Sequence, residues 1–222
     1  MTETLPLFPL GTVLYPGLVL PLHVFEDRYK QLVRDLLNEP EPRRFGVIAI
    51  RVGRETGIGG VSALHEVGCT ATVREVVEAD NGQYDLVTVG TDRFRLHQLD
   101  DSRPYLSGEV ELLGELLGDE AAAALAAAAV QRGFRAYLNI LAERGAAAIS
   151  VPDLPDEPIL LSYLVAASMI IELNDRQGLL AQPDAVRRLS AERALLAKET
   201  AIVREFGTTP ATDLRSAPYN PN

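Results

Sequence analysis

The first 21 residues contain four prolines between short apolar runs, and this punctuation limits the fold more than any other feature of the chain. Proline lacks an N–H group and restricts the residue before it, so four such positions cannot all lie inside the ladder of a central sheet. They suit extended edge segments that wrap around a barrel. Tyr15-Pro16-Gly17-Leu18 predicts a type II turn, because proline sets φ at its second position and glycine accepts a positive φ at its third.

An amphipathic helix is expected directly after these prolines. Its apolar side chains recur at helical spacing and form one stripe: Phe25, Tyr29, Leu32, Val33, Leu36 and Leu37. Glu26 and Asp27 occupy the first turn, where the helix dipole favours negative charge. Strand patterns resume after this helix, so it is an insertion between strands.

Strand patterns fill the rest of the first half. β-branched and aromatic residues are dense in Thr70–Glu78 and Tyr84–Val89, on either side of Asp80-Asn81-Gly82. The Asn-Gly pair predicts a hairpin with a type I′ turn. Residues 93–97 and 105–112 alternate between apolar and polar side chains, which is typical of strands with one buried and one solvated face. We therefore expect a small antiparallel β-barrel with one inserted helix.

The composition changes near residue 118, where the chain becomes rich in alanine and poor in strand-forming residues. Asp119 is expected to cap a helix that runs toward Glu143, and apolar stripes predict further helices over 159–173 and 183–206. The expected fold class is α+β, with a β-barrel subdomain over 1–117 and an α-helical bundle over 118–206. Residues 207–222 are rich in proline, serine, threonine and asparagine, and we expect them to be a disordered tail.

Net charge and the length of the apolar runs exclude several classes of protein. The formal charge of −10 opposes general nucleic-acid binding and attraction to an anionic membrane, since both require a basic surface. The longest strongly apolar stretch, Ile159–Ile171, has 13 residues and is shorter than the roughly 20 that a spanning helix needs. The chain starts without a signal-peptide layout and has one cysteine, so the expected location is cytoplasmic.

No constellation for catalysis, cofactor binding or metal binding emerges from the sequence. Gly57–Gly60 lacks the spacing of a nucleotide loop, and Lys30 and Lys198 lie on predicted amphipathic helices, where solvated lysines are ordinary. The three histidines are far apart and lack metal-ligand spacing: His23, His65 and His97. Cys69 falls in a predicted strand, where a buried structural thiol is expected. We therefore expect a protein that is not an enzyme and that has neither a cofactor nor a metal site.

The opening run LPLFPLGTVLYPGLVLPLHVFEDRY resembles the start of the Lon protease N-terminal (substrate-binding) domain family, in its free-standing form without ATPase or peptidase modules. Later blocks are similar to the strands and the helical end of that family: FGVIAIR, HEVGCTATVREVVEADNGQYDLVTVGTDRFRL, YLSGEVELL and ELNDRQGLLAQPDAVRRLSAERALL. The resemblance covers roughly residues 5–206. It implies a PUA-like pseudo-barrel and a module that recognises exposed apolar or unfolded polypeptide.

The resemblance thus implies a non-catalytic polypeptide-binding module, whose partners are unfolded or partly folded polypeptides together with a protease or chaperone. An extended peptide can pair with an edge strand of a small barrel through main-chain hydrogen bonds. The candidate peptide-binding patch combines the proline turn with the start of the first helix: Tyr15, Pro16, Phe25, Glu26, Asp27, Arg28 and Tyr29. In the competing interpretation, Phe25 and Tyr29 are core residues and the charged residues form an ordinary solvated helix start.

Two other functions stay open. The first is an adaptor or scaffold that docks a specific folded protein through the helical bundle. The second is an enzyme or RNA binder of unrecognised type. A local basic cluster keeps RNA as a minor interpretation: Arg43, Arg44, Arg51 and Arg54.

Overall fold

The computed structural model describes residues 2–53, 61–143 and 153–206. The chain divides into two compact units, a sheet unit that ends at Gly114 and a helical unit that begins at Glu115. The expected disordered tail, 207–222, lies outside the described residues.

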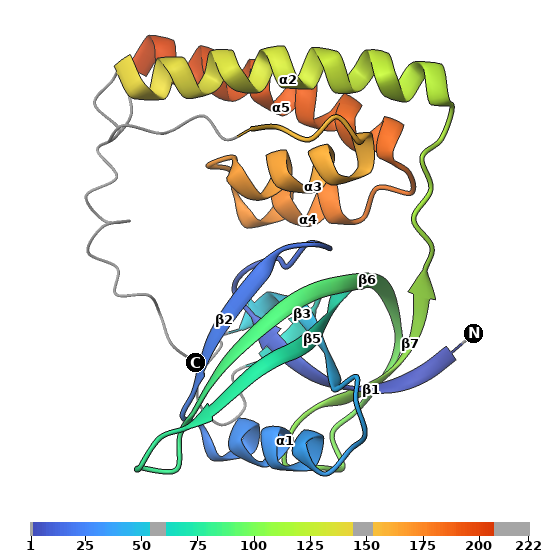
Figure 1. Ribbon diagram of the computed structural model, residues 1–222, viewed down its shortest axis with the longest axis vertical. Coiled ribbons are helices and arrows are strands. Elements are labelled where there is room, and N and C mark those ends of the chain that lie inside the picture. The colour runs from blue at the N-terminus through green and yellow to red at the C-terminus, as the bar shows by residue number, and fades with distance from the viewer. Residues whose placement is uncertain (1, 54–60, 144–152, 207–222) are drawn as a thin grey trace. The chain divides into compact units, whose positions relative to one another are not determined.

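One sheet and one helix make up the described sheet unit (Figure 1). The strands are β1 (Thr2–Leu10), β2 (Val19–Val24), β3 (Arg44–Gly53), β4 (Val61–Leu64), β5 (Val67–Glu78), β6 (Tyr84–Asp100) and β7 (Ser107–Leu113). The helix α1 (Asp27–Leu37) follows β2 in the chain and lies at one end of the sheet (Figure 1). The inserted helix expected from the sequence is therefore confirmed.

The sheet is mixed, with the strand order β1-β7-β6-β5-β3-β4 and with β2 paired to the first part of β6. β1 changes partner along its length, since Thr2–Pro6 pairs antiparallel with β7 and Leu7–Leu10 pairs parallel with β3. The expectation of a small antiparallel β-barrel is therefore wrong, because the sheet is mixed and is not a closed barrel. Alternating side chains indicate where strands lie but carry no information about their direction, so the parallel pair could not be foreseen.

The prolines of the opening segment mark a turn, an edge strand and the strand that changes partner. The N–H of Leu18 donates to the carbonyl of Tyr15 (3.3 Å) and Gly17 has a φ of 81°, as expected for the predicted turn. Pro21 lies on β2, which pairs with β6 alone among the described strands. An edge strand tolerates a proline because its outer side needs no N–H.

The expected hairpin joins β5 and β6, but its turn is of another type. The N–H of Gly82 donates to the carbonyl of Ala79 (2.8 Å), and the N–H of Ala79 donates to the carbonyl of Gln83 (2.9 Å). A type I′ turn requires a positive φ at both central residues, whereas the only positive-φ residues of the described chain are glycines. Asn81 therefore has a negative φ, and the type I′ prediction is wrong. Gly82 alone, with φ 73°, takes the left-handed conformation.

Two apolar clusters fill the sheet unit. In the larger cluster the rings of Tyr29, on α1, and Phe8, on β1, stack with their centroids 4.0 Å apart. The smaller cluster comprises Leu5, Leu7, Ile48, Phe94 and Val110. Phe8 and Leu7 are neighbours on β1 and belong to different clusters, so both faces of this strand are buried. This double burial explains why β1 has a nearly continuous apolar sequence.

Four helices are described in the helical unit: α2 (Glu120–Glu143), α3 (Pro158–Ser168), α4 (Leu173–Leu180) and α5 (Ala185–Phe206). α2 and α5 lie side by side (Figure 1), and α5 also packs against α3 and α4. The carboxylate of Asp119 accepts a hydrogen bond from the N–H of Ala122 (2.8 Å), so the predicted cap of α2 is confirmed. That these helices form a regular bundle stays a prediction.

α3 is shorter than the helix expected over 159–173. The backbone leaves the helix at Met169, which has extended φ and ψ angles of −73° and 142°. The guanidinium of Arg176, on α4, donates to the carbonyls of Met169 (3.0 Å) and Ile171 (3.3 Å). A side chain thus satisfies carbonyls that a longer α3 would have paired internally.

Candidate functional site

The seven candidate residues at the proline turn and the start of α1 differ in exposure. Three are buried, namely Tyr15, Pro16 and Tyr29. Three are half-buried, namely Phe25, Glu26 and Arg28, and Asp27 is exposed. The buried residues can therefore support a binding surface only by holding the turn and the helix in place.

Tyr29 is an anchor between α1 and the sheet. Its side chain is 2% exposed, and its ring stacks on Phe8 at an interplanar angle of 16°. The guanidinium of Arg28 lies over the same ring, 4.6 Å from its centroid. Tyr29 is thus a core residue, as the competing interpretation of the sequence had it.

The charged residues at the start of α1 are paired with one another. Glu26 Oε2 accepts from Arg28 Nε (3.0 Å) and forms an ion pair with Arg28 Nη2 (2.9 Å). Lys30 forms an ion pair with Asp27, and its hydrogen bond and charge lower the pKa of the Asp27 carboxyl. Both pairs consist of one acid and one base, so this helix start has little net charge.

An apolar surface that the sequence did not single out lies beside this helix start. Val19 and Pro21 on β2 are paired in register with Val89 and Val87 on β6. Directly paired residues of antiparallel strands, and residues two apart on one strand, share a face of the sheet. Val19 is 62% exposed, Pro21 is exposed, and Val87 and Val89 are half-buried. We call these four residues the β2 face.

The β2 face continues onto β5 and toward α1. Val77 on β5 is paired with Asp85 and is 50% exposed. Asp85 is two residues before Val87 on β6, and its carboxylate is 2.7 Å from His23 Nδ1 on β2. The ring of His23 lies 6.3 Å from that of Phe25, centroid to centroid. Phe25 therefore connects the candidate patch to the β2 face.

The main-chain groups of β2 alternate between pointing toward β6 and pointing away from it. The carbonyl of Leu18 accepts from the N–H of Gly90 (2.8 Å), and that of Leu20 accepts from Thr88 Oγ1 (2.7 Å), so both point toward β6. Because backbone groups alternate in direction along a strand, those of Val19 and His23 point away from β6. The proline between them has no N–H to offer, which limits pairing at this edge.

Three residues of types used in catalysis or metal binding are buried or are paired with another side chain. Cys69 is buried, and His97 Nε2 is 3.2 Å from Glu111 Oε2. Lys198 forms an ion pair with Asp175 (3.7 Å). Within the described ranges no three histidine, cysteine, aspartate or glutamate side chains gather as metal ligands would. Gly57–Gly60 lies outside those ranges.

The basic cluster near β3 is partly neutralised. Arg44 donates to Glu3 Oε2 (3.0 Å), and Arg43 Nη1 lies 3.7 Å from Glu41 Oε1. Arg51 is exposed, and Arg54 lies outside the described residues. Paired arginines have less charge available for phosphate, so the cluster gives little support to RNA binding.

None of the helices in the described parts of the chain has the length and apolar character needed to cross a membrane.

The mixed sheet with an inserted helix and the four described helices after it define a two-unit α+β protein. A family model described as the ATP-dependent protease La (LON) substrate-binding domain matches residues 4–198. The chain therefore belongs to this family. The match is to the non-catalytic substrate-binding domain of Lon, and the ATPase and protease domains are not covered.

Two of the curated relatives are Lon proteases. Lon protease 2 of Myxococcus xanthus is 26% identical over 204 residues, which cover 91% of this chain and 24% of that protein. Lon protease of Escherichia coli strain K12 is 24% identical over 196 residues, covering 88% of this chain and 25% of that protein. The chain thus spans about a quarter of the length of these relatives.

Two solved structures of similar size share the fold. A Lon N-terminal domain protein from Xanthomonas campestris is 27% identical, with a TM-score of 0.60, and the match covers 88% of this chain and 98% of that one. The N-terminal domain of Mycobacterium avium complex Lon protease has a TM-score of 0.64 at 17% identity, covering 90% and 98%. The second likeness shows the fold alone. The family-model match confirms the family expected from the opening segment.

Proposed function

We propose that this chain recognises extended apolar segments of unfolded or partly folded polypeptides on the β2 face and the adjoining start of α1. The observation that carries the proposal is the pair of exposed apolar residues on the edge strand β2, Val19 and Pro21, which lie beside half-buried valines of β6, in a family whose model is described as substrate-binding. Contiguous exposed apolar side chains are uncommon on soluble proteins and mark sites of interaction.

Side chains provide most of the binding energy in this proposal. Val19 and Val77 are at least half exposed in the structure and have apolar area left to bury against a client. Burying a fully exposed valine contributes roughly 1.5–3 kcal/mol, and only the exposed part of each of these two side chains is left to bury, so the binding is expected to be weak and reversible.

Main-chain pairing adds a smaller contribution. The N–H groups of Val19 and His23 point away from β6 and can pair with an extended client, while Pro21 between them cannot donate. A short paired segment fits a module that must release many different clients. Any edge-strand contact is therefore expected to span only a few residues.

Acidic residues at the border of the β2 face indicate the flanks of a preferred client. Asp85 is exposed at one end, and Glu75, also exposed, is paired in register with Val87. Opposite charges on the client would gain attraction at this border and speed the encounter. We therefore propose apolar segments flanked by lysine or arginine as preferred clients.

The test is a binding titration with a fluorescent apolar peptide flanked by lysines, using fluorescence anisotropy. Val19→Asp and Val77→Asp each replace an exposed valine, so the fold should tolerate both. Each is expected to weaken binding by about 2 kcal/mol, or roughly 30-fold, because a charge is placed where a valine would be buried. A peptide with glutamate flanks should bind more weakly than the lysine-flanked one.

The matched control is Leu125→Asp. Leu125 lies on α2 in the helical unit and is 75% exposed. It should leave the affinity of the peptide unchanged. If all three variants bind like the unchanged protein, the β2 face is not the site.

The adaptor alternative is favoured by one observation, the exposure of Leu125 on α2. Under that alternative a folded partner docks on the helical unit, and Leu125→Asp alone would abolish its capture. The binding titration separates the two functions, because each assigns the sensitive residue to a different unit.

A further inference from the structure

The carboxylate of Glu192 lies buried in α5 without a hydrogen-bond donor among the described residues. Glu192 is 0% exposed, and neither of its carboxylate oxygens has a hydrogen-bond partner among the described residues. A charged carboxylate in such a place would lose its hydration without compensation, which is among the largest costs a folded protein can bear.

The positive charge that acts on this carboxyl belongs to Arg188, which makes hydrogen bonds to other groups. Arg188, one turn before Glu192 on α5, is 0% exposed and is the charged residue that acts on the Glu192 carboxyl. Its Nη1 donates to Ser162 Oγ (2.9 Å) and its Nε donates to the carbonyl of Leu179 (3.2 Å). The guanidinium thus links α5 to α3 and to the end of α4.

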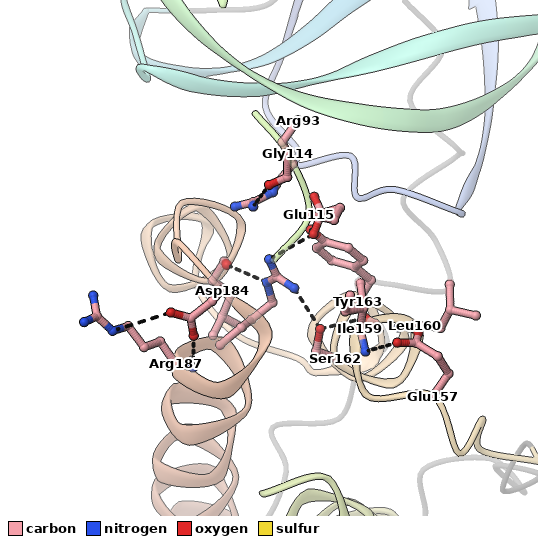
Figure 2. A network of polar contacts seen from close by, with 12 residues as sticks. Arg93, Gly114, Glu115, Glu157, Ile159, Leu160, Ser162, Tyr163, Asp184 and Arg187 are labelled. Atoms are coloured by element: carbon pink, nitrogen blue, oxygen red, sulfur yellow. Dashed lines mark hydrogen bonds and ion pairs between the residues drawn. The ribbon is translucent and has the colours of Figure 1, made fainter. Parts of the chain in front are cut away.

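Two more groups hold this guanidinium in place. Glu115 Oε2 lies 3.7 Å from Arg188 Nη2 and accepts from the hydroxyl of Tyr163 (2.6 Å). The ring of Tyr163 faces the guanidinium, with 4.0 Å between the Arg188 Cζ atom and the ring centroid. Figure 2 shows Glu115, Tyr163 and Ser162 close to one another, and an ion pair, a ring contact and a hydrogen bond link them to Arg188. Arg188 therefore forms an ion pair with Glu115 and makes no hydrogen bond to the Glu192 carboxylate.

The charged residues of α2 are exposed, namely Glu120, Arg132, Arg135 and Glu143. The remaining ionisable groups on the elements packed against α5 have partners of their own. They are Tyr137 on α2, bonded to the N–H of Ile170 (3.3 Å), Arg176 on α4, bonded to the carbonyls of Met169 and Ile171, and Asp175 on α4, paired with Lys198. On α3 the ionisable side chain is Tyr163, bonded to Glu115. None of these groups provides a hydrogen bond for Glu192.

We propose that Glu192 is a proton-dependent lock on the helical unit, because α5 packs fully against its neighbours only while this carboxyl is neutral. When the carboxyl loses its proton to solvent, the buried charge must reach water, and α5 has to loosen locally to let it. Burial raises the pKa of Glu192 well above its ordinary range, and the opposing effect of Arg188 is smaller.

The direction of the pH effect follows from proton linkage. A carboxyl whose pKa is higher in the folded state binds more protons there than in the unfolded state. Its contribution is absent below the unfolded pKa of about 4.5 and destabilises the fold progressively as pH rises above it. Between that value and the folded pKa, the unfolding equilibrium constant rises about tenfold per pH unit from this group alone.

The test is urea unfolding of the full chain between about pH 5 and pH 8, followed by the helical circular dichroism signal. Glu192→Gln removes the titration and keeps the shape of the side chain. It is expected to unfold with a smaller equilibrium constant than the unchanged protein at the upper pH, with the difference shrinking toward the lower one. Glu192→Met, neutral and without polar atoms to satisfy, is the second variant in case the amide prevents folding.

Glu205→Gln is the matched control, since Glu205 is an exposed glutamate on the same helix. It should follow the pH profile of the unchanged protein. Carbon-13 NMR of labelled glutamate should show one carboxyl that titrates far above the others and disappears in Glu192→Gln. Parallel pH profiles for the unchanged protein and both Glu192 variants would overturn the proposal, and so would a Glu192 variant that loses stability more steeply with rising pH than the unchanged protein does.

Discussion

Gly90 on β6 is the position where one added methyl group should do the most damage to the β2 face. A Cβ atom built there would lie 2.3 Å from the carbonyl oxygen of Tyr15 and 3.0 Å from its carbonyl carbon. Both contacts are with backbone atoms, which cannot rotate away as a side chain can. Gly90→Ala must therefore push the turn after Tyr15 off the sheet.

The magnitude follows from what holds that turn. The N–H of Gly17 donates to the carbonyl of Gly90 and the N–H of Gly90 donates to the carbonyl of Leu18, both at 2.8 Å. Overpacking costs about 1–3 kcal/mol, and weakening a hydrogen bond adds about 1 kcal/mol. We expect Gly90→Ala to lower the free energy of unfolding of the sheet unit by roughly 2–4 kcal/mol. Val19 begins β2 directly after this turn, so peptide affinity should fall as well.

Gly133→Ala is the control with the opposite sign. Gly133 lies inside α2, and its nearest atom to an added Cβ is Leu196 Cδ1 at 3.6 Å, an ordinary contact. Removing a helical glycine should stabilise the helical unit by about 0.5–1 kcal/mol. Urea unfolding read by peptide-resolved hydrogen exchange reports on the two units separately. A Gly90→Ala protein as stable in β2 and β6 as the unchanged chain would refute the steric reasoning.

Three further outcomes are expected. Tyr29→Ala, which removes the ring stacked on Phe8, should destabilise the sheet unit by about 3–4 kcal/mol in urea unfolding. Asp119→Ala, which removes the cap of α2, should cost about 1 kcal/mol and lower the melting temperature of the helical unit. Burial and the charge of Arg51 lower the pKa of His65, so the folded state binds fewer protons below about pH 6.5. The free energy of unfolding should therefore decrease as the pH is lowered through this range, and His65→Gln should reduce that loss in acid unfolding.

The fold was largely predictable wherever local rules decide it. The proline turn, the inserted helix with its Tyr29 stripe and the cap at Asp119 all depend on a few neighbouring residues. The direction of β1 relative to β3 depends on contacts between residues about forty positions apart, and the alternation of apolar and polar side chains gives no information about such contacts. The type I′ prediction for the hairpin was wrong because an Asn-Gly pair permits such a turn without requiring it.

The candidate site was only partly predictable. Phe25 to Arg28 were selected because they follow the most distinctive segment, and their role in binding stays a prediction. The burial of Tyr15 and Tyr29 required the structure. The β2 face could have been found from the alternation of Val19, Pro21 and His23 with apolar neighbours, since a proline there marks an outer edge. Its partners on β6 are about seventy residues away in the chain, and only the register shows that they share a face.

Hydrogen exchange with and without a model unfolded polypeptide tests the central claim most directly. The account predicts that the polypeptide slows exchange in β2 and at the start of α1, and that Val19→Asp removes this protection. Protection confined to α2 and α5, or none in the sheet unit, would contradict it.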